Sequence, residues 1–236
     1  MNEFYGVLKE IINRTETVVS FRFLPENKIK FLPGQFVRVM FDPSDKKNKN
    51  MNKYLSFSCS PGKEYIEVTK RLSDSDFSKA LKRLTPGDKL MFQGPMGNCV
   101  FSEDYKKVGF LIGGIGITPV ISMLEYITEN KLNTDIILLY SNRNHQETAF
   151  RKELDDWKRE FNNIKTVYIL TDCIPEDEIC IQGQINKELI LSKVADIMQR
   201  KFFIFGPPVM VEAIKLVCIE CGCSKDMIFE ENFVGY

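Results

Sequence analysis

The chain carries two different patterns of hydrophobic and polar residues, one before and one after about residue 103. In the first 40 residues, apolar and polar positions alternate roughly with period two, and Val18, Val19, Phe21 and Phe23 are good strand formers. Such alternation is typical of strands with one buried face. After about residue 105, short apolar runs alternate with stretches of helical periodicity. We therefore divide the chain into two domains, residues 1–103 and 104–236.

The first domain is rich in short strands separated by turn residues. Pro33-Gly34, Pro61-Gly62 and Pro86-Gly87 each mark a turn, and the polar segment 42–52 forms a loop. A single short helix is predicted at residues 76–84. Many short strands with one short helix predict a closed antiparallel β-barrel. The predicted strands are residues 6–23, 35–40, 54–58, 65–70 and 89–93.

The second domain alternates apolar strands with helices, which predicts a parallel sheet covered on both faces. The fold class is thus an N-terminal antiparallel β-barrel followed by a C-terminal α/β parallel-sheet domain. The predicted strands are residues 108–112, 135–140, 164–170, 201–205 and 227–230. The predicted helices are residues 118–129, 146–160, 186–199 and 207–221.

The segment Val108–Pro119, VGFLIGGIGITP, joins a buried strand to a helix through a glycine turn. Glycines let a phosphate approach the backbone, and amides at a helix start point toward it. Thr118 is expected to cap the helix, with Pro119 at its first position. A tight structural turn explains the glycines equally well, and the spacing GGxGxTP differs from GxGxxG. The segment alone leaves both interpretations open.

Composition and charge restrict the class of protein. The 236 residues are 44% hydrophobic and 27% charged, a globular balance. No apolar run approaches the ~20 residues that span a membrane, and the first ten residues do not resemble a secretory signal. We expect a cytoplasmic protein with neither a membrane span nor a nucleic-acid partner.

The two halves of the chain differ in charge. Residues 1–100 hold 17 Lys and Arg against 11 Asp and Glu, and the rest hold 15 against 21, so the halves carry +6 and −6. Attraction between two domains explains this difference. The alternative is a basic face for an acidic partner, which the cluster Lys46, Lys47, Lys49 and Lys53 supports weakly.

Seven cysteines, an odd number, argue against a disulfide framework in an intracellular chain. Cys218, Cys221 and Cys223 form a C-x2-C-x-C cluster that offers three metal or iron–sulfur ligands but has no fourth cysteine at a familiar spacing. We favour structural cysteines and expect no metal. His145 lies among polar residues and carries no catalytic signal.

Seven short motifs follow one another along the chain. They are KYLSFS (53–58), FSKAL (77–81), PGD and GPMG (86–97), GGIGITP (113–119), LLYSNR (138–143), FGPPVM (205–210) and EENFVGY (230–236). In this order and spacing they resemble the ferredoxin–NADP reductase superfamily in its short bacterial and archaeal form. The resemblance covers essentially the whole chain and implies an oxidoreductase that binds a flavin on the barrel and a nicotinamide nucleotide on the α/β domain.

The resemblance implies a flavin site on the barrel. Lys53 replaces the usual Arg that neutralises a flavin phosphate, Leu55 replaces an aromatic that stacks on the flavin, and Ser56 lies near flavin N5. Ser75 or Asp76 caps the helix whose Ser78 binds phosphate, and Gly94 and Gly97 leave room for the cofactor. The full implied set is Lys53, Tyr54, Leu55, Ser56, Phe57, Val68, Thr69, Lys70, Phe77, Ser78, Gly94, Pro95 and Phe233.

The resemblance also implies a site for NADH or NADPH. Thr118 would face the nicotinamide-side ribose or phosphate, and Phe205 stands where the family has a cysteine. Arg143 suits a 2′-phosphate, whereas Asp172 and Glu147 suit free ribose hydroxyls, so NADH is favoured and NADPH stays open. The implied set is Gly113, Gly114, Gly116, Thr118, Pro119, Arg143, Asp172, Gly206, Pro207, Pro208 and Met210.

The C-terminal segment resembles a family ending in which a carboxylate precedes a stacking aromatic by two residues. Glu231 and Phe233 match that spacing, with Tyr236 as an alternative stacking residue. Phe233 would cover the flavin, and Glu231 would relay a proton to N5 through Ser56. An exposed tail is the alternative. The implied catalytic set is Ser56, Glu231 and Phe233.

The resemblance implies hydride transfer from NAD(P)H to bound FAD, with FMN possible, and then electron transfer to an acceptor. The acceptor is a small molecule or an acidic carrier of the ferredoxin or flavodoxin type, which the Lys46–Lys53 loop would dock. One alternative is the flavin subunit of a larger oxidoreductase complex. The incomplete cysteine set favours a free-standing reductase over that subunit. The remaining alternative is a nucleotide-binding module that has lost its flavin.

Overall fold

The computed structural model of the protein describes residues 2–172 and 180–233. It divides into two compact units. The first unit holds the chain up to Phe101 together with Thr118–Tyr126, and the second holds Ser102–Ile117 and the chain from Ile127 onward. The division after Phe101 lies near the boundary predicted from the sequence. The grouping of Thr118–Tyr126 with the first unit is a feature that the sequence did not suggest.

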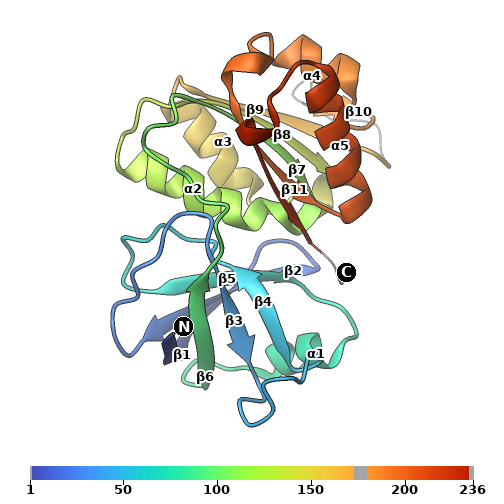
Figure 1. Ribbon diagram of the computed structural model, residues 1–236. Helices are drawn as coiled ribbons and strands as arrows, with labels where there is room; N and C mark the ends of the chain where they lie inside the picture. Colours follow the sequence, from blue (N-terminus) through green and yellow to red (C-terminus); the bar gives the residue numbers. More distant parts are fainter. Residues whose placement is uncertain (1, 173–179, 234–236) are drawn as a thin grey trace. The chain divides into compact units, whose positions relative to one another are not determined.

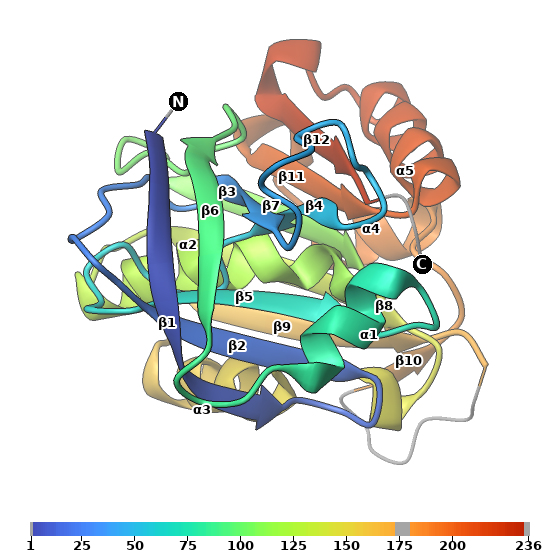
Figure 2. The same ribbon diagram turned by 90° about the horizontal axis from the view of Figure 1, so that it is seen from below.

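The first unit is built on a six-stranded antiparallel sheet that curls into a nearly closed barrel, which confirms the predicted fold. Figure 2 shows β1 beside β6 and β2 beside β5, with the two pairs crossing as the sheet curls. The strand order is β4-β3-β6-β1-β2-β5. The strands are β1 (Asn2–Asn13), β2 (Val18–Pro25), β3 (Phe36–Met40), β4 (Asn52–Ser56), β5 (Ile66–Arg71) and β6 (Lys89–Met96).

The two edge strands of this sheet, β4 and β5, come together at what we call the seam. The isolated bridge between Phe57 and Val68 joins them, and the Ser58 amide donates to the Glu67 carbonyl at 2.9 Å. The chain segment between the two strands contains the predicted Pro61-Gly62 turn. The barrel thus closes through a few contacts rather than a continuous ladder.

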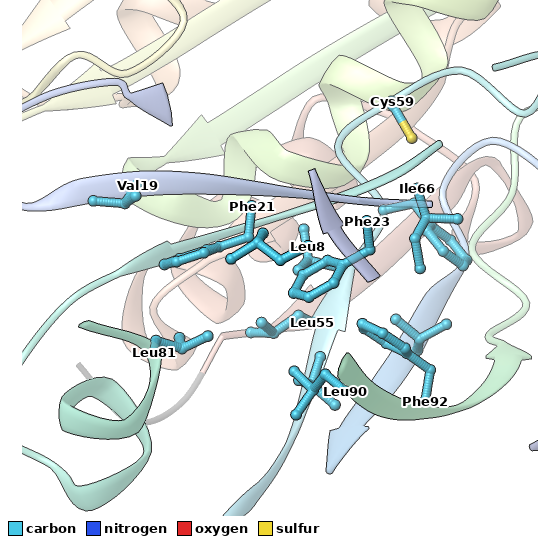
Figure 3. Close-up of a cluster of buried hydrophobic side chains, with 14 of the residues drawn as sticks. Leu8, Val19, Phe21, Phe23, Leu55, Cys59, Ile66, Leu81, Leu90 and Phe92 are labelled. Carbon is cyan, nitrogen blue, oxygen red and sulfur yellow. The ribbon is translucent and has the colours of Figure 1, made fainter. Parts of the chain in front are cut away.

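Alternate residues of the strands fill the barrel with apolar side chains. Figure 3 shows Phe23 of β2 and Phe92 of β6 side by side among the apolar side chains of this core. The rings of Phe23 and Phe92 meet edge to face, with centroids 4.9 Å apart. Phe57 stacks on Phe31 at 3.9 Å. This period-two burial is the physical basis of the alternation seen in the sequence.

Buried polar groups line the seam beside this core. Glu67 is almost fully buried and pairs with Arg14 at 3.1 Å and Arg22 at 2.7 Å. The Thr69 hydroxyl lies 2.7 Å from both the Ser20 and the Ser58 hydroxyls. A buried carboxylate is tolerated only when it is paired and hydrogen-bonded, and here the two guanidinium groups meet that condition.

The second unit is a six-stranded parallel sheet with helices on both faces, as predicted. Figure 1 shows α4 and α5 together on one side of this sheet and α3 on the other. The strand order is β10-β9-β8-β7-β11-β12. The strands are β7 (Lys107–Gly113), β8 (Asp135–Asn142), β9 (Ile164–Leu170), β10 (Cys180–Gln182), β11 (Lys201–Gly206) and β12 (Ile228–Asn232). The helices are α1 (Asp76–Arg83) in the barrel unit, then α2 (Ile117–Glu129), α3 (Arg151–Glu160), α4 (Lys187–Lys193) and α5 (Pro208–Glu220).

The helices differ from the prediction at their ends, most of all in α3 and α4. Helix α3 starts at Arg151 rather than residue 146, because a 3-10 turn, His145–Glu147, and left-handed Phe150 (φ 61°) precede it. Helix α4 ends at Lys193, well before the predicted residue 199. Within residues 2–172 and 180–233, no helix is both long enough and apolar enough to cross a membrane.

Candidate functional site

The order of strands in the second unit places a ligand site at one edge of its sheet. From β7 the chain proceeds outward through β8, β9 and β10, and then returns to the other side of β7 as β11 and β12. In open parallel sheets, ligands bind beyond the carboxyl ends of the strands where the order reverses. That point lies between β7, which ends at Gly113, and β11, which ends at Gly206.

Two motifs that are distant in sequence meet at this reversal point. A Cβ at Gly206 would lie 3.3 Å from the Gly113 backbone, and a Cβ at Gly113 would lie 2.4 Å from Met210 Sδ. A Cβ at Gly116 would lie 2.5 Å from the Phe205 carbonyl oxygen. The GGIG and FGPPVM segments therefore pack directly together. Gly116 and Gly206 lie against backbone of the other segment, and Gly113 lies against the Met210 side chain. This packing is a structural explanation for the glycines. The sequence had left open whether they serve a tight turn or a phosphate site.

The turn after β7 leaves backbone exposed for a ligand. Gly114 has φ +52°, and nothing lies within 4 Å of where its Cβ would be. A 3-10 turn, Gly114–Gly116, leads directly into α2. The predicted cap is wrong: α2 begins at Ile117, so Thr118 lies inside the first helical turn and is buried. Pro119 follows in the same turn, where a missing amide hydrogen costs little.

The carboxyl ends of β8 and β9 add polar residues to the same edge. The Asp172 amide donates to the Arg143 carbonyl at 2.9 Å, so these two predicted residues are neighbours. Asn142, which the sequence analysis missed, is 6% exposed, and in the described part of the chain neither its amide nitrogen nor its oxygen has a hydrogen-bond partner. Such an orphaned amide is costly unless a ligand satisfies it. Its position, directly after an apolar strand, is the sequence signal that could have found it.

The C-terminal strand brings two more predicted residues to this edge. Glu231 pairs with Phe205 across β12 and β11, and the Phe233 amide donates to the Gly206 carbonyl at 2.9 Å. The Phe233 and Phe205 rings are 6.4 Å apart. Within the second unit, Phe233 thus lies beside the reversal point. Tyr236 lies outside the described residues. The roles of Glu231 and Phe233 toward a flavin stay predictions.

In the first unit, the predicted flavin residues gather at the seam of the barrel. Ser56 and Phe57 end β4, while Val68 and Thr69 lie on β5, and the Phe57–Val68 bridge joins the two groups. All four side chains are buried, and the Thr69 hydroxyl is occupied by Ser20 and Ser58. For Phe57, Val68 and Thr69, contact with a ligand would therefore come mainly from the backbone.

Neighbouring residues on β4 face in opposite directions. Tyr54 is 59% exposed, with the Arg38 guanidinium 5.6 Å from its ring centroid, whereas Leu55 is 9% exposed and belongs to the barrel core. The alternation of a strand produces this difference. Leu55 therefore has a packing role in addition to its predicted place beside a flavin, and Tyr54 is the accessible aromatic of the pair.

A cluster of cations lies at the same seam. Burial lowers the pKa of Lys70, and the positive charges of Lys53 and Arg71 lower it further. Lys70 also donates to the Arg71 carbonyl at 2.8 Å. Cations that destabilise one another in a partly buried place are stabilised by an anion. The seam therefore fits a phosphate-bearing ligand, and Lys53 and Lys70 are the residues that would hold it.

The start of helix α1 offers a second group for phosphate. The Ser75 hydroxyl caps the helix by accepting from the Ser78 amide at 3.3 Å. The Ser78 hydroxyl lies 3.1 Å from that of Ser75 and 3.2 Å from that of Ser73. Ser75 is thus the cap, rather than Asp76, and Ser73 is an addition to the predicted set. Phe77 points into the barrel core, where it anchors the helix.

The glycines of the GPMG segment have a different role from the one expected. A Cβ at Gly94 would lie 3.0 Å from Val37 Cγ1, and one at Gly97 would lie 2.8 Å from the Phe36 ring. The space that these glycines leave is therefore filled by β3. The expectation that they leave room for a cofactor is corrected here: they allow β3 to approach β6. A contact from Gly94 or Pro95 to a flavin stays a prediction.

Two family models match the chain and together span most of it. Residues 7–101 match the oxidoreductase FAD-binding domain, and residues 110–216 match the oxidoreductase NAD-binding domain. The chain belongs to the ferredoxin–NADP reductase superfamily. The seam of the barrel lies in the residues that match the FAD-binding domain, and the reversal point lies in those that match the NAD-binding domain.

Relatives of the chain include proteins named as reductases. The chain is 28% identical to the reductase subunit of glycine betaine monooxygenase from Chromohalobacter salexigens, over 95% of this chain and 62% of the relative. It is 31% identical to NADH-cytochrome b5 reductase 2 from Debaryomyces hansenii, over 72% of this chain and 58% of the relative. The chain thus spans about three fifths of the length of these relatives.

Among solved structures, a ferredoxin NADP+ reductase from Neisseria gonorrhoeae with bound FAD and NADP shares the fold. Its TM-score is 0.84 with 19% identity, and the match covers 98% of this chain and 99% of that one. This likeness confirms the fold of the chain.

Proposed function

We propose that the protein is a flavin-dependent oxidoreductase that takes a hydride from NAD(P)H onto bound FAD and passes electrons to an acceptor. The observation that carries this proposal is the meeting of GGIG and FGPPVM at the reversal point of the parallel sheet. The match of the FAD-binding domain to the barrel, and the cations at its seam, support the flavin half.

The residues of the second unit would bind and orient the nicotinamide nucleotide. The exposed backbone at Gly114 and the amides of the following turn suit the pyrophosphate. The Asn142 amide offers a donor and an acceptor that find no partner in the described residues, and it suits a polar group of the nucleotide. Arg143 and Asp172 lie farther along the same edge, where the adenosine ribose is expected.

The residues of the first unit would hold the flavin. Lys53, Lys70 and the hydroxyls at the start of α1 would neutralise and bind its phosphates. When bound, the flavin supplies the redox chemistry, since it accepts two electrons and releases them singly or as a pair. The Ser56 hydroxyl, at the end of β4, would donate a hydrogen bond that orients the reacting ring.

Absorbance spectroscopy of the purified protein tests the flavin half of the proposal. We expect a yellow protein with flavin absorbance that NADH or NADPH bleaches in the absence of oxygen. Comparison of the two nucleotides gives the preference, for which we expect NADH. A colourless protein that takes up neither FAD nor FMN would refute the proposal and leave a nucleotide-binding module.

Replacement of one hydroxyl tests the role of Ser56. Ser56→Ala should lower the rate of flavin reduction about tenfold, the effect of one lost hydrogen bond in the transition state, with flavin still bound. Ser58→Ala is a matched control, because its hydroxyl is occupied by Thr69 and Glu67. Stopped-flow reduction kinetics that are unchanged in Ser56→Ala would contradict the assigned role.

A flavin subunit of a larger complex is the second candidate function. The relative from Chromohalobacter salexigens is named a reductase subunit, and this chain spans 62% of its length. Gel filtration and iron analysis of the protein from its native source separate the two candidates. A stable heteromeric complex supports the subunit, whereas an active single chain supports a free-standing reductase.

We further propose that an acidic electron carrier docks on the Lys46–Lys53 loop of the first unit. Lys47 and Lys49 are exposed on this loop, while Lys46 forms an ion pair with Glu3. Electrostatic steering falls steeply with ionic strength. Turnover with a ferredoxin or flavodoxin should therefore fall with added salt, and a Lys47→Gln/Lys49→Gln variant should lose that dependence. Turnover that ignores salt with every such carrier would count against the loop.

A further inference from the structure

Helix α5 ends in a tight turn that brings three cysteines together. The Gly222 amide donates to the Ile219 carbonyl at 2.9 Å, and the Cys223 amide donates to the Cys218 carbonyl at 3.0 Å. Gly222 has φ +92°. These two bonds and the left-handed glycine define a Schellman motif. The motif fixes the backbone at Cys218 and Cys223 relative to each other, five residues apart in sequence.

A Schellman motif usually carries an apolar contact between its first and last residues, and here both are cysteines. Cys218 is fully buried and Cys223 is 5% exposed, and both belong to the core beneath α4 and α5. Their thiols are close enough that each affects the pKa of the other. The Cys223 thiol also lies 3.6 Å from the Ile197 carbonyl. The backbone turn therefore holds the two thiols near each other in one defined place.

The third cysteine of the cluster is more accessible. Cys221 is the residue that ends the helix, is half-buried, and lies close enough to influence both other thiols. In the described part of the chain, no three side chains of His, Cys, Asp or Glu are arranged to hold a metal ion. The geometry thus offers a pair of neighbouring thiols with an accessible thiol beside it, rather than a metal site.

We propose that Cys218 and Cys223 are a redox-active pair that closes into a disulfide when the protein meets a low-molecular-weight disulfide. The two cysteine thiols are oxidised, the S–S bond of the external disulfide is reduced, and their two protons leave with the two small thiols released. The balance is one external disulfide consumed and two small thiols formed for each Cys218–Cys223 bond. This reaction is independent of the flavin chemistry.

Cys221 gives the reaction an entry point. Burial raises the pKa of Cys218 to about 12 and also raises that of Cys223. Both residues therefore stay mostly in the thiol form, which is a poorer nucleophile than the thiolate. Cys221 therefore attacks the external disulfide first and releases one small thiol. Cys223 then attacks the Cys221 sulfur and releases the second, and Cys218 attacks the Cys223 sulfur and returns Cys221 to its free form.

Peptide mapping tests the proposal, because one tryptic peptide, residues 216–225, contains all three cysteines and no other. The whole protein is incubated with mixtures of reduced and oxidised glutathione, free thiols are alkylated, and the peptide is analysed by tandem mass spectrometry. We expect one alkylated thiol, at Cys221, and a mass about 2 Da below that of the peptide with one alkylated and two free thiols. An internal bond that includes Cys221, or a glutathione adduct as the end product, would overturn the proposal.

Serine variants at the three positions sharpen the test. Cys221→Ser should form the same bond at least tenfold more slowly, since the entry thiol is gone. Cys218→Ser and Cys223→Ser should stop at a bond or a glutathione adduct that includes Cys221. Circular dichroism of each reduced variant confirms that it is folded, and the wild-type map decides the proposal even if a variant is not. A Cys221→Ser variant that forms no Cys218–Cys223 bond at any glutathione ratio would also refute it.

Discussion

The two units each contain a turn that we propose binds phosphate, and the two turns would offer it different groups. In the second unit the turn Gly113–Gly116 is backbone, fitted against the backbone of Phe205 and Gly206. In the first unit the turn Ser73–Ser78 is a set of hydroxyls, with the cations of β4 and β5 nearby in the fold. The glycine turn works because its residues have no side chains, whereas the serine turn works through its side-chain hydroxyls.

This difference decides how each turn responds to change. Where such a turn packs backbone against backbone, as Gly116 does against the Phe205 carbonyl, glycine has no substitute, because a Cβ would meet atoms that cannot easily move. A turn made of hydroxyls and ammonium groups can exchange one polar side chain for another. The same contrast appears in the sequence, where GGIGITP matches its family motif residue for residue while Lys53, Leu55 and Ser75 depart from theirs.

The largest effect is expected from Gly116→Ala. The new methyl would lie 2.5 Å from the Phe205 carbonyl oxygen, so the backbone of β11 must move. Overpacking of this kind costs about 2–3 kcal/mol, and thermal unfolding should occur at lower temperature with loss of nucleotide binding. Gly62→Ala is the control, since its nearest neighbour is 4.0 Å away and it should stay within about 0.5 kcal/mol. Equal melting temperatures for Gly116→Ala and Gly62→Ala would contradict the claim that Gly116 is required by backbone packing.

A smaller effect is expected at the hydroxyl turn. Ser75→Ala removes the cap of α1 and should cost about 1 kcal/mol of stability. Ser75→Asp restores a capping oxygen and should melt like the wild type, yet its charge should weaken flavin binding about tenfold. Thermal melting measures the stability of each variant, and fluorescence titration of the flavin-free protein measures its affinity for flavin. A variant with aspartate that binds flavin as tightly as the wild type would exclude the turn from the phosphate site.

The smallest effect concerns Lys70 and pH. Its pKa lies below the ordinary 10.5, because burial and the charges of Lys53 and Arg71 disfavour the charged form. The charged form therefore destabilises the free fold below that pKa, and stability rises as pH increases through it. Anion binding has the opposite dependence, because it needs the charge. Flavin affinity should thus fall by less than tenfold between pH 8 and pH 10, and Lys70→Gln should remove most of that fall.

Periodicity was enough to predict both folds, because each unit buries its residues with the period of its main element. The alternation in β2 fills the barrel core, and the continuous run in β7 is buried on both faces. The sequence could not show the strand order that joins β4 to β5 at a seam, since an isolated bridge and a few hydrogen bonds of Ser58 connect them instead of a ladder. It also missed β10, whose three residues are too few to establish a period.

The candidate sites were partly predictable for a similar reason. Short motifs identified GGIG and FGPPVM, and the structure shows that they meet. The cap at Thr118 was wrong because a 3-10 turn starts the helix earlier, a feature that composition does not specify. The room expected at Gly94 is filled by Val37, a contact across strands distant in sequence. Asn142 became visible only when its buried amide was found without a partner in the described residues.

The barrel seam has a consequence for how the first unit opens. Strands held by full ladders exchange their amide hydrogens only when the whole unit unfolds, whereas β4 and β5 share one bridge and a few side-chain contacts. Parting at the seam would therefore be the least costly local opening of the barrel. Since the predicted flavin residues lie on both β4 and β5, a bound flavin would contact both strands and make their separation less frequent. Hydrogen exchange at the Ser58 amide, which donates to the Glu67 carbonyl across the seam, would then report occupancy of the site without any measurement of colour or turnover.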